Sequence, residues 1–153
     1  MNLKHIIISA SVIALGVLSI NAIKKGEPKD TLDKRKFTVM MTEVKEGGPP
    51  KKAVEDELEF KGGKVFSTFL FDNKKLKWIK YEITKDSTYT DEDQNENHYT
   101  EAEISTTDET DQTVIIKCVV DNYDISGEIK VTKKDKLKKK YEFIGKEKAT
   151  KKK

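Results

Sequence analysis

The sequence predicts an all-β domain, and three observations support this prediction. From residue 37 onward, apolar and polar residues alternate in short runs, as they do in strands that bury one face. Polar turns containing Gly, Asn and Asp separate the runs. The hydrophobic fraction is only 35% and the charged fraction is 37%, so the apolar residues suffice for one side of each strand. We expect eight strands, over residues 37–42, 54–60, 65–71, 78–84, 98–105, 113–120, 123–131 and 139–144.

The first 22 residues predict an export segment. Lys4 is their only charged residue, and an apolar run from Ile6 to Ile20 precedes the small residue Ala22. The run is shorter than the roughly 20 residues of a membrane-spanning helix. We therefore expect residues 1–22 to be a helical signal peptide, cleaved as the protein is exported to the periplasm or secreted. The alternative is an uncleaved helix that anchors the chain.

The polar residues 23–36 predict a flexible leader before the first strand. Further along, residues 65–71 (VFSTFLF) are the most apolar strand candidate, and Asp72-Asn73 predicts the turn that ends it. Residues 113–120 and 123–131 are separated only by Asp121-Asn122, which predicts a tight hairpin with Tyr123 facing inward.

Eight antiparallel strands without long crossovers favour closure into an up-and-down β-barrel over residues 37–145. A two-sheet β-sandwich is the alternative. An eight-stranded barrel is wide enough to be filled by side chains or to hold one small ligand. The expected interior includes Ile104 and Ile129, together with the residues that we take as candidate ligand contacts: Phe37, Phe60, Phe69, Tyr81, Ile116, Ile125, Tyr141 and Phe143.

The stretch from Leu58 to Gly145 resembles the lipocalin-like (calycin) barrels of small exported bacterial proteins. The resemblance rests on strand number, strand spacing and four short patterns: Leu58-x-Phe60-x-x-Gly63-Lys64-x-Phe66-Ser67, Tyr81, Ser126-Gly127-x-Ile129 and Tyr141-x-Phe143-x-Gly145. It implies a closed barrel whose interior binds a small apolar molecule.

Residues 86–112 contain ten carboxylates and neither Lys nor Arg. Residues 91–97 place oxygen-bearing side chains at alternate positions, as calcium-binding loops do. However, Glu96 stands where such a loop needs Gly, and Ala102 stands where it needs a bidentate Glu. We therefore expect a solvated acidic hairpin loop, with weak calcium binding as the alternative, and we predict neither metal nor cofactor for the protein.

Residues 133–153 contain eleven lysines, three acidic residues and no arginine. We expect a solvated hairpin tip followed by a lysine-rich disordered tail over residues 146–153. A basic surface of this kind can also contact an anionic cell-envelope surface, and the acidic middle of the chain leaves head-to-tail self-association open. We expect no nucleic-acid partner, because Tyr141 and Phe143 alternate as core residues and the chain is exported.

No catalytic group emerges from the sequence. The single cysteine, Cys118, alternates with apolar residues and is expected to be a buried, unreactive thiol. His98 is the one histidine after the export segment, and Ser67, Ser105 and Ser126 lie in no nucleophile-elbow pattern. The sequence thus favours an exported, non-enzymatic barrel that binds a small hydrophobic ligand. The alternative is a module with a filled core that acts through its charged surface.

Overall fold

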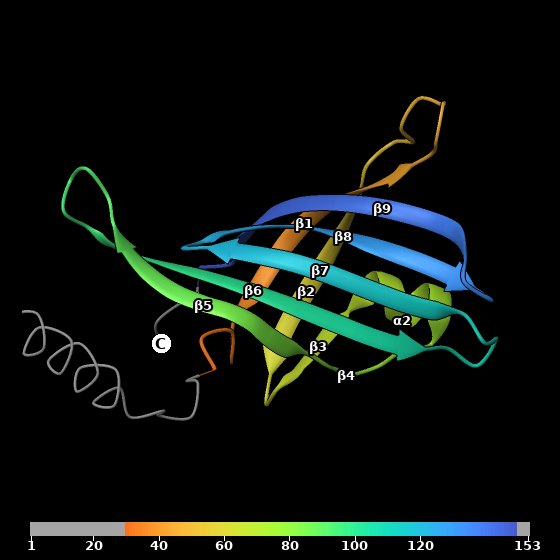
Figure 1. The fold of residues 1–153 in the computed structure, drawn as a ribbon, viewed down its shortest axis with the longest axis horizontal. Coiled ribbons are helices and arrows are strands. Elements are labelled where there is room, and N and C mark those ends of the chain that lie inside the picture. Colours follow the sequence, from red (N-terminus) through yellow and green to blue (C-terminus); the bar gives the residue numbers. More distant parts are fainter. Residues whose placement is uncertain (1–29, 150–153) are drawn as a thin grey trace, which may run out of the picture.

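The computed structural model describes residues 30–149, so the predicted export segment and residues 150–153 lie outside the described part. Within it, one short helix interrupts a series of antiparallel strands (Figure 1). The strands and the helix are β1 (Lys36–Val44), β2 (Val54–Lys61), β3 (Lys64–Ser67), α2 (Thr68–Lys74), β4 (Ile79–Lys80), β5 (Glu82–Thr90), β6 (Glu96–Thr107), β7 (Thr113–Asp121), β8 (Asp124–Lys133) and β9 (Lys136–Glu147).

The strands form a nearly closed barrel. Their order in the single sheet is β4-β3-β2-β1-β9-β8-β7-β6-β5, and every pair of neighbours is antiparallel. The first and last strands pair over eight residues each, from Phe37 opposite Glu147 to Val44 opposite Lys140. The two edge strands, β4 and β5, are joined through one residue, and β4 also lies close to β6. This arrangement confirms the predicted up-and-down barrel rather than a sandwich.

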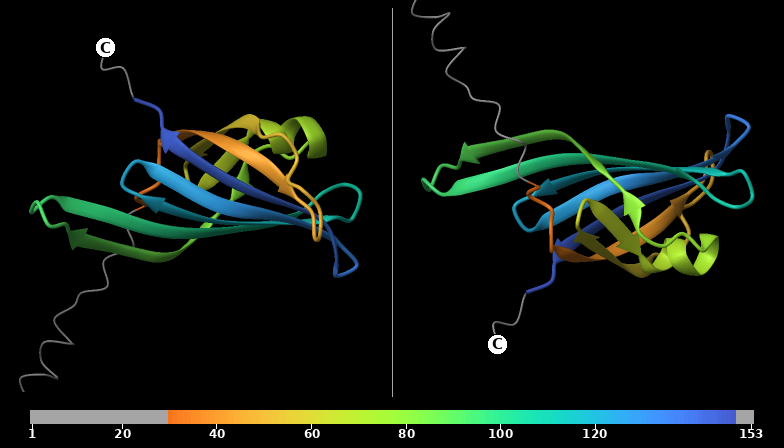
Figure 2. Two further views of the ribbon diagram at one scale, coloured as in Figure 1. Left: turned by 90° about the horizontal axis from the view of Figure 1, so that it is seen from above. Right: turned by 90° about the horizontal axis from the view of Figure 1, so that it is seen from below.

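The barrel has two ends with different loops (Figure 2). The β5–β6 hairpin projects at one end, while α2 and the β8–β9 turn lie at the other.

Tyr81 marks the place where the sheet stops short of closure. The predicted strand 78–84 covers β4 and the start of β5, but its two halves have different partners. Ile79 pairs with Val65 of β3, whereas Ile83 pairs with Ala102 of β6. The chain changes partner at Tyr81, whose N–H donates to the carbonyl of Gly63 (3.2 Å). One predicted strand therefore counts as two, which explains nine strands in place of about eight.

The prediction of a strand over residues 65–71 is confirmed for residues 65–67 and wrong for residues 68–71, and the predicted turn at 72–73 is wrong as well. β3 ends at Ser67, and the next seven residues are helical. The Ser67 hydroxyl accepts a hydrogen bond from the N–H of Leu70 (3.1 Å), which is the arrangement of a helix N-cap. Only Leu70 is buried within the helix. A capping serine inside an apolar run thus ends the strand and starts a helix of about two turns.

Asp56 of β2 fixes the start of this helix. Its carboxylate accepts hydrogen bonds from the Ser67 hydroxyl (2.7 Å) and from the N–H of Phe69 (2.9 Å). Asp56 is buried, and these bonds satisfy a charge that burial would otherwise penalise. The helix ends at Lys75, which has a left-handed backbone and donates to the carbonyl of Phe71 (3.0 Å).

The tight hairpin between β7 and β8 is confirmed, but its turn is shifted by one residue. Asp121 pairs with Asp124, so the turn consists of Asn122 and Tyr123, with Asn122 at φ 53°. Tyr123 is 73% exposed, and its predicted inward orientation is wrong.

The folded part extends beyond the predicted barrel limits of 37 and 145. Residues 30–35, predicted as part of a flexible leader, form a turn in which Leu32 is fully buried. At the other end, β9 continues to Glu147, and the N–H of Lys148 donates to the carbonyl of Lys36 (2.8 Å).

The candidate interior residues do face the core. Seven of the eight are at most 8% exposed, and Phe69 is partly buried against the same cluster. Their rings contact one another edge to face. The centroid distances are 5.9 Å for Phe37–Phe60, 5.2 Å for Phe60–Tyr81 and 5.0 Å for Phe69–Tyr141. Such burial contributes roughly 1.5–3 kcal/mol per large apolar side chain, so these residues are a major part of the fold's stability.

Candidate functional site

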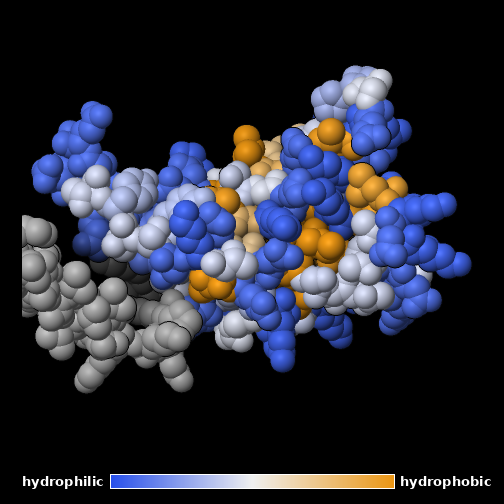
Figure 3. Space-filling view, viewed as in Figure 1, coloured by the Kyte–Doolittle hydropathy of each residue, from blue (hydrophilic) through white to orange (hydrophobic). Residues whose placement is uncertain are grey.

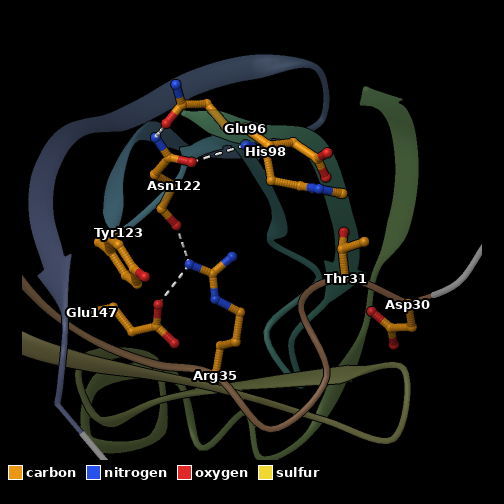
Figure 4. Close-up of a pocket in the computed structure, with 9 residues that line it drawn as sticks. Asp30, Thr31, Arg35, Glu96, His98, Asn122, Tyr123 and Glu147 are labelled. Carbon is orange, nitrogen blue, oxygen red and sulfur yellow. Dashed lines mark hydrogen bonds and ion pairs between the residues drawn. The ribbon is translucent and has the colours of Figure 1, made fainter. Parts of the chain in front are cut away.

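A polar cavity of about 510 Å³ opens at the end of the barrel where β1 begins and β9 ends (Figure 4). We call it the Arg35 cavity. Its volume is within the range of small-molecule sites, which is about 300–1,000 Å³. It is lined by Asp30, Thr31, Arg35, Glu96, Asn97, His98, Asn122, Tyr123 and Glu147.

Arg35 lies at the centre of this cavity and is the one arginine in the sequence. Its Nη2 donates to Oε2 of Glu147 (2.6 Å) and to the carbonyl of Asn122. The guanidinium also lies over the ring of Phe37, 5.0 Å from its centroid. These contacts hold the guanidinium in one position, with its side chain only 17% exposed.

The turn before β1 positions Arg35. Lys34 has a left-handed backbone, and its N–H donates to the carbonyl of Phe60 (2.8 Å). The N–H of Phe60 in turn donates to the carbonyl of Arg35 (2.9 Å). The pairing with β2 therefore continues to residues that precede the start of β1. The buried side chain of Leu32 fixes the other half of the turn.

Asp30 closes one side of the cavity through Tyr81. The Tyr81 hydroxyl lies 2.7 and 2.6 Å from the two carboxylate oxygens of Asp30, and the N–H of Leu32 also donates to this carboxylate (3.1 Å). Burial, together with the hydrogen bond to Asp30, raises the pKa of Tyr81. Tyr81 therefore stays a neutral hydrogen-bond donor, and it joins the turn to the seam between β4 and β5.

His98 and Asn122 form the opposite wall. The N–H of His98 donates to Oδ1 of Asn122 (2.8 Å), and the N–H of Asn122 donates to the carbonyl of His98 (2.8 Å). The imidazole Nε2 of His98 lies 3.0 Å from Oδ1 of Asp86. The same oxygen accepts from the hydroxyls of Thr31 (3.2 Å) and Thr100 (2.9 Å). A continuous hydrogen-bond network thus joins Arg35, Asn122, His98, Asp86 and Thr31.

Cys118 is buried, as predicted. Burial raises the pKa of its thiol to about 12, so the thiolate needed for nucleophilic chemistry does not form near neutral pH.

A second candidate site is the opposite, basic end of the barrel. Residues 43–52 and 133–140 contain nine lysines against three acidic residues. The two segments meet at a hollow of about 550 Å³ between β1 and β9. We call the exposed lysines there the lysine end: Lys45, Lys52, Lys134, Lys136, Lys138 and Lys139. Within the described residues, the ion pairs at this end use other lysines, namely Lys51, Lys74 and Lys140.

Two features distinguish the lysine end from an ordinary charged surface. Leu137 projects among the lysines and is 49% exposed. The positive charge at this end also lowers the pKa of Glu43, through a hydrogen bond from Lys51 and through the charges of Lys139 and Lys45. Figure 3 shows hydrophilic side chains over both this end and the β5–β6 hairpin, with apolar patches between them.

The predicted acidic loop forms the tip of the β5–β6 hairpin. Asp91 organises it by accepting hydrogen bonds from the N–H groups of Asp93 (3.0 Å) and Asn95 (2.9 Å). Hydrogen bonds, first from the Asn97 side chain and then from Asn95, lower the pKa of Asp91. Among residues 30–149 there is no group of three or more His, Cys, Asp or Glu side chains arranged to hold a metal ion.

The structure brings together three of the candidate interior residues, Phe37, Phe60 and Tyr81, directly beneath the Arg35 cavity. Phe69 and Tyr141 instead contact each other near α2. Sequence reasoning missed Arg35, and one signal could have found it: a single arginine occurs in a chain with 30 basic residues. Arginine differs from lysine in offering a planar set of five N–H donors.

Comparisons with protein-family models, with curated proteins and with solved structures gave no match for this chain. The barrel is thus established by the structure, while the lipocalin-like resemblance stays a prediction. No helix in the described part is long and apolar enough to cross a membrane.

Proposed function

We propose that this protein is an exported, non-enzymatic β-barrel that attaches to anionic lipid surfaces of the cell envelope through its lysine end. The observation that carries the proposal is the projection of Leu137 among exposed lysines that form no ion pair within the described residues. Basic clusters of four to eight residues are attracted to anionic lipid, at about 1 kcal/mol per residue near the surface. An exposed leucine among them adds apolar contact with the acyl region.

The filled interior supports a function at the surface. The aromatic rings of Phe37, Phe60 and Tyr81 contact one another where an internal ligand would lie. This packing favours surface binding over the alternative hypothesis of a small apolar ligand held inside the barrel.

Export is part of the proposal and rests on the sequence of residues 1–22. We expect the purified mature chain to begin at Ile23, and Edman sequencing or intact mass measurement after expression with the export segment tests this. A full-length mass would favour the uncleaved anchor instead.

Vesicle sedimentation tests the attachment itself. The protein should bind phosphatidylcholine vesicles containing about 30% phosphatidylglycerol, release at high salt, and ignore pure phosphatidylcholine. The triple variant K134E/K136E/K138E should lose this binding. Its matched control is K61E/K64E/K80E, which makes the same charge change at exposed positions around β3. Equal loss in both variants would mean that net charge alone is responsible and would contradict the proposal.

A second pair of variants separates a lipid surface from a soluble polyanion. Leu137→Ser should weaken vesicle binding severalfold, because it removes the apolar contact. Ile144→Ser, at a 69% exposed position on the barrel wall, should leave it unchanged. If Leu137→Ser binds vesicles as well as the parent protein, charge alone holds the protein on the vesicle and the proposed apolar contact of Leu137 with lipid is wrong.

A further inference from the structure

We propose that the Arg35 cavity binds a small zwitterion, a molecule that carries a carboxylate and an ammonium group, as free amino acids and short peptides do. The inference is independent of the lysine end, which lies at the other end of the barrel. It rests on the donors of Arg35, on the acidic groups that face them, and on the rigidity of the cavity wall.

Arg35 selects the carboxylate. Within residues 30–149, its hydrogen bonds to Glu147 and Asn122 both leave from Nη2. Nη1 carries two further N–H groups, and in Figure 4 this nitrogen points into the open space between His98 and Thr31. A guanidinium that is already fixed by its neighbours loses little freedom when it binds an anion, and its hydrogen bonds to carboxylate are charge-assisted.

Glu96 selects the ammonium group. Three carboxylates line the cavity, those of Asp30, Glu96 and Glu147, against the one guanidinium. Arg35 pairs with Glu147, and Asp30 accepts from Tyr81, whereas the carboxylate of Glu96 has no hydrogen bond or ion pair within the described residues. Its carboxylate lies beside the His98 ring, across the cavity from Arg35 (Figure 4).

The balance of these charges excludes simpler ligands. A simple carboxylate would meet Arg35 but would be repelled by the acidic groups around it. A simple amine would meet Glu96 but would leave the Nη1 donors of Arg35 without an acceptor. A zwitterion satisfies both, and the two charged walls then orient it.

The cavity wall is suited to this role because it is already organised. His98 and Asn122 exchange two hydrogen bonds, and Asp86 joins His98 to Thr31. Tyr123, 73% exposed at the rim, offers an aromatic face for the remainder of the ligand. A free amino acid and a peptide differ in the length of this remainder, so probes of different length distinguish them.

Nuclear magnetic resonance of the ¹⁵N-labelled protein tests the inference. Glycine, diglycine and triglycine are the probes, with acetate and methylamine as the two half-ligands. We expect at least one zwitterion to shift the amide resonances of His98 and Asn122 with a Kd of about 1 mM or tighter, and the half-ligands to bind at least tenfold more weakly. The tightest of the three probes shows whether the site prefers an amino acid or a peptide.

Two variants report on the two walls. Glu96→Gln removes an exposed carboxylate and should weaken zwitterion binding about tenfold or more. Glu92→Gln, on the same hairpin but outside the cavity, is its matched control and should bind as the parent does. Arg35→Lys keeps the positive charge but loses the Nη1 donors, and should also weaken binding about tenfold.

Three results would overturn the inference. They are the absence of shifts with all three zwitterions at about 10 mM, acetate or methylamine binding as tightly as the zwitterions, and equal weakening by Glu96→Gln and Glu92→Gln. The Glu96→Gln variant keeps the inference falsifiable even if Arg35→Lys fails to fold.

Discussion

Gly127 of β8 lies directly opposite Phe143 of β9, and the space left by its absent side chain is next to the Phe143 ring. A Cβ atom placed on Gly127 would come within 2.6 Å of Cζ of Phe143 and within 2.3 Å of the carbonyl oxygen of Lys117. Both glycine and phenylalanine face the interior, so the pair sets how closely β7, β8 and β9 can pack there.

The first prediction concerns this pair. Gly127→Ala should lower the free energy of unfolding by about 3 kcal/mol, at the upper end of the cost of overpacking, because the Lys117 carbonyl belongs to the backbone and cannot rotate away. Urea unfolding followed by circular dichroism measures the change. Gly48→Ala is the control, since the nearest atom to its new Cβ would be 3.7 Å away. A stability equal to that of Gly48→Ala would contradict the packing described for β8 and β9.

The second prediction concerns the turn before β1. Leu32 is fully buried, so Leu32→Ala should cost about 2–5 kcal/mol, as it does for core leucines. Leu137→Ala makes the same change at a 49% exposed site and should cost less than about 1 kcal/mol. The two variants are compared by thermal and urea unfolding. If they were equally stable, residues 30–35 would not be part of the folded barrel.

The third prediction concerns pH. Asp108 is buried in the β6–β7 turn and accepts hydrogen bonds from the N–H (2.8 Å) and hydroxyl (2.7 Å) of Thr110 and from the N–H of Gln112 (3.0 Å). Lys74 of α2 lies 3.1 Å from it. Burial alone would raise the pKa of this carboxyl, but these hydrogen bonds outweigh burial and hold the pKa well below its usual value of 3.8.

Because the folded protein favours the ionised form of Asp108, the stability it contributes is present above about pH 4 and is lost as the pH falls below that value. The unfolding free energy is measured from pH 7 down to pH 3, roughly the range over which carboxyls titrate. As the pH is lowered, it should therefore fall more steeply for the parent than for Asp108→Asn. Asp111→Asn, at an exposed position in the same turn, should follow the parent. Parallel curves for the parent and Asp108→Asn would contradict the assignment.

The fourth prediction concerns the thiol of Cys118. Its raised pKa and its burial mean that it should not react with Ellman's reagent at about pH 8 in the folded protein. It should react fully once guanidinium chloride unfolds the chain. The variant Ser105→Cys places a second thiol at an exposed position. That thiol should react at once in the folded state. Fast reaction of Cys118 itself in the folded protein would show that β7 opens locally.

The fifth prediction concerns the interior. Native mass spectrometry of the purified protein, before and after mild organic extraction, should give the same mass, because the buried aromatic side chains beneath the Arg35 cavity contact one another. An additional mass that disappears on extraction would restore the hypothesis of an internal apolar ligand.

Period-two alternation was sufficient to predict the barrel and its inward-facing residues apart from Tyr123, because each strand here buries one face only. Ile125, Ile129, Tyr141 and Phe143 are all buried where alternation placed them. Alternation failed at Ser67, where a single hydroxyl caps a helix. The partner of that hydroxyl, Asp56, lies eleven residues earlier, and a local pattern does not contain such a contact.

The candidate site was less accessible to prediction. The Arg35 cavity combines residues from the turn before β1, the β5–β6 hairpin, the β7–β8 turn and the end of β9. Arg35 and Glu147 are 112 positions apart in sequence. Their meeting follows from the pairing of β1 with β9, which becomes known only when the barrel is closed. The sequence of residues 133–140 alone predicts a basic surface. It does not predict that residues 43–52 contribute to the same surface, because that follows from the pairing of β1 with β9.

The pairing of β1 with β9 also has a consequence for how the chain is made. One edge of β1 finds its partner only in residues 140–147, which lie 96 to 110 positions later in the chain, so the barrel cannot close before β9 has been synthesised. Contacts between such distant segments are slow to form, because a long loop must first be closed. A chain that stays open until its last strand is available is well adapted to being threaded across a membrane before it folds, as the proposed export requires.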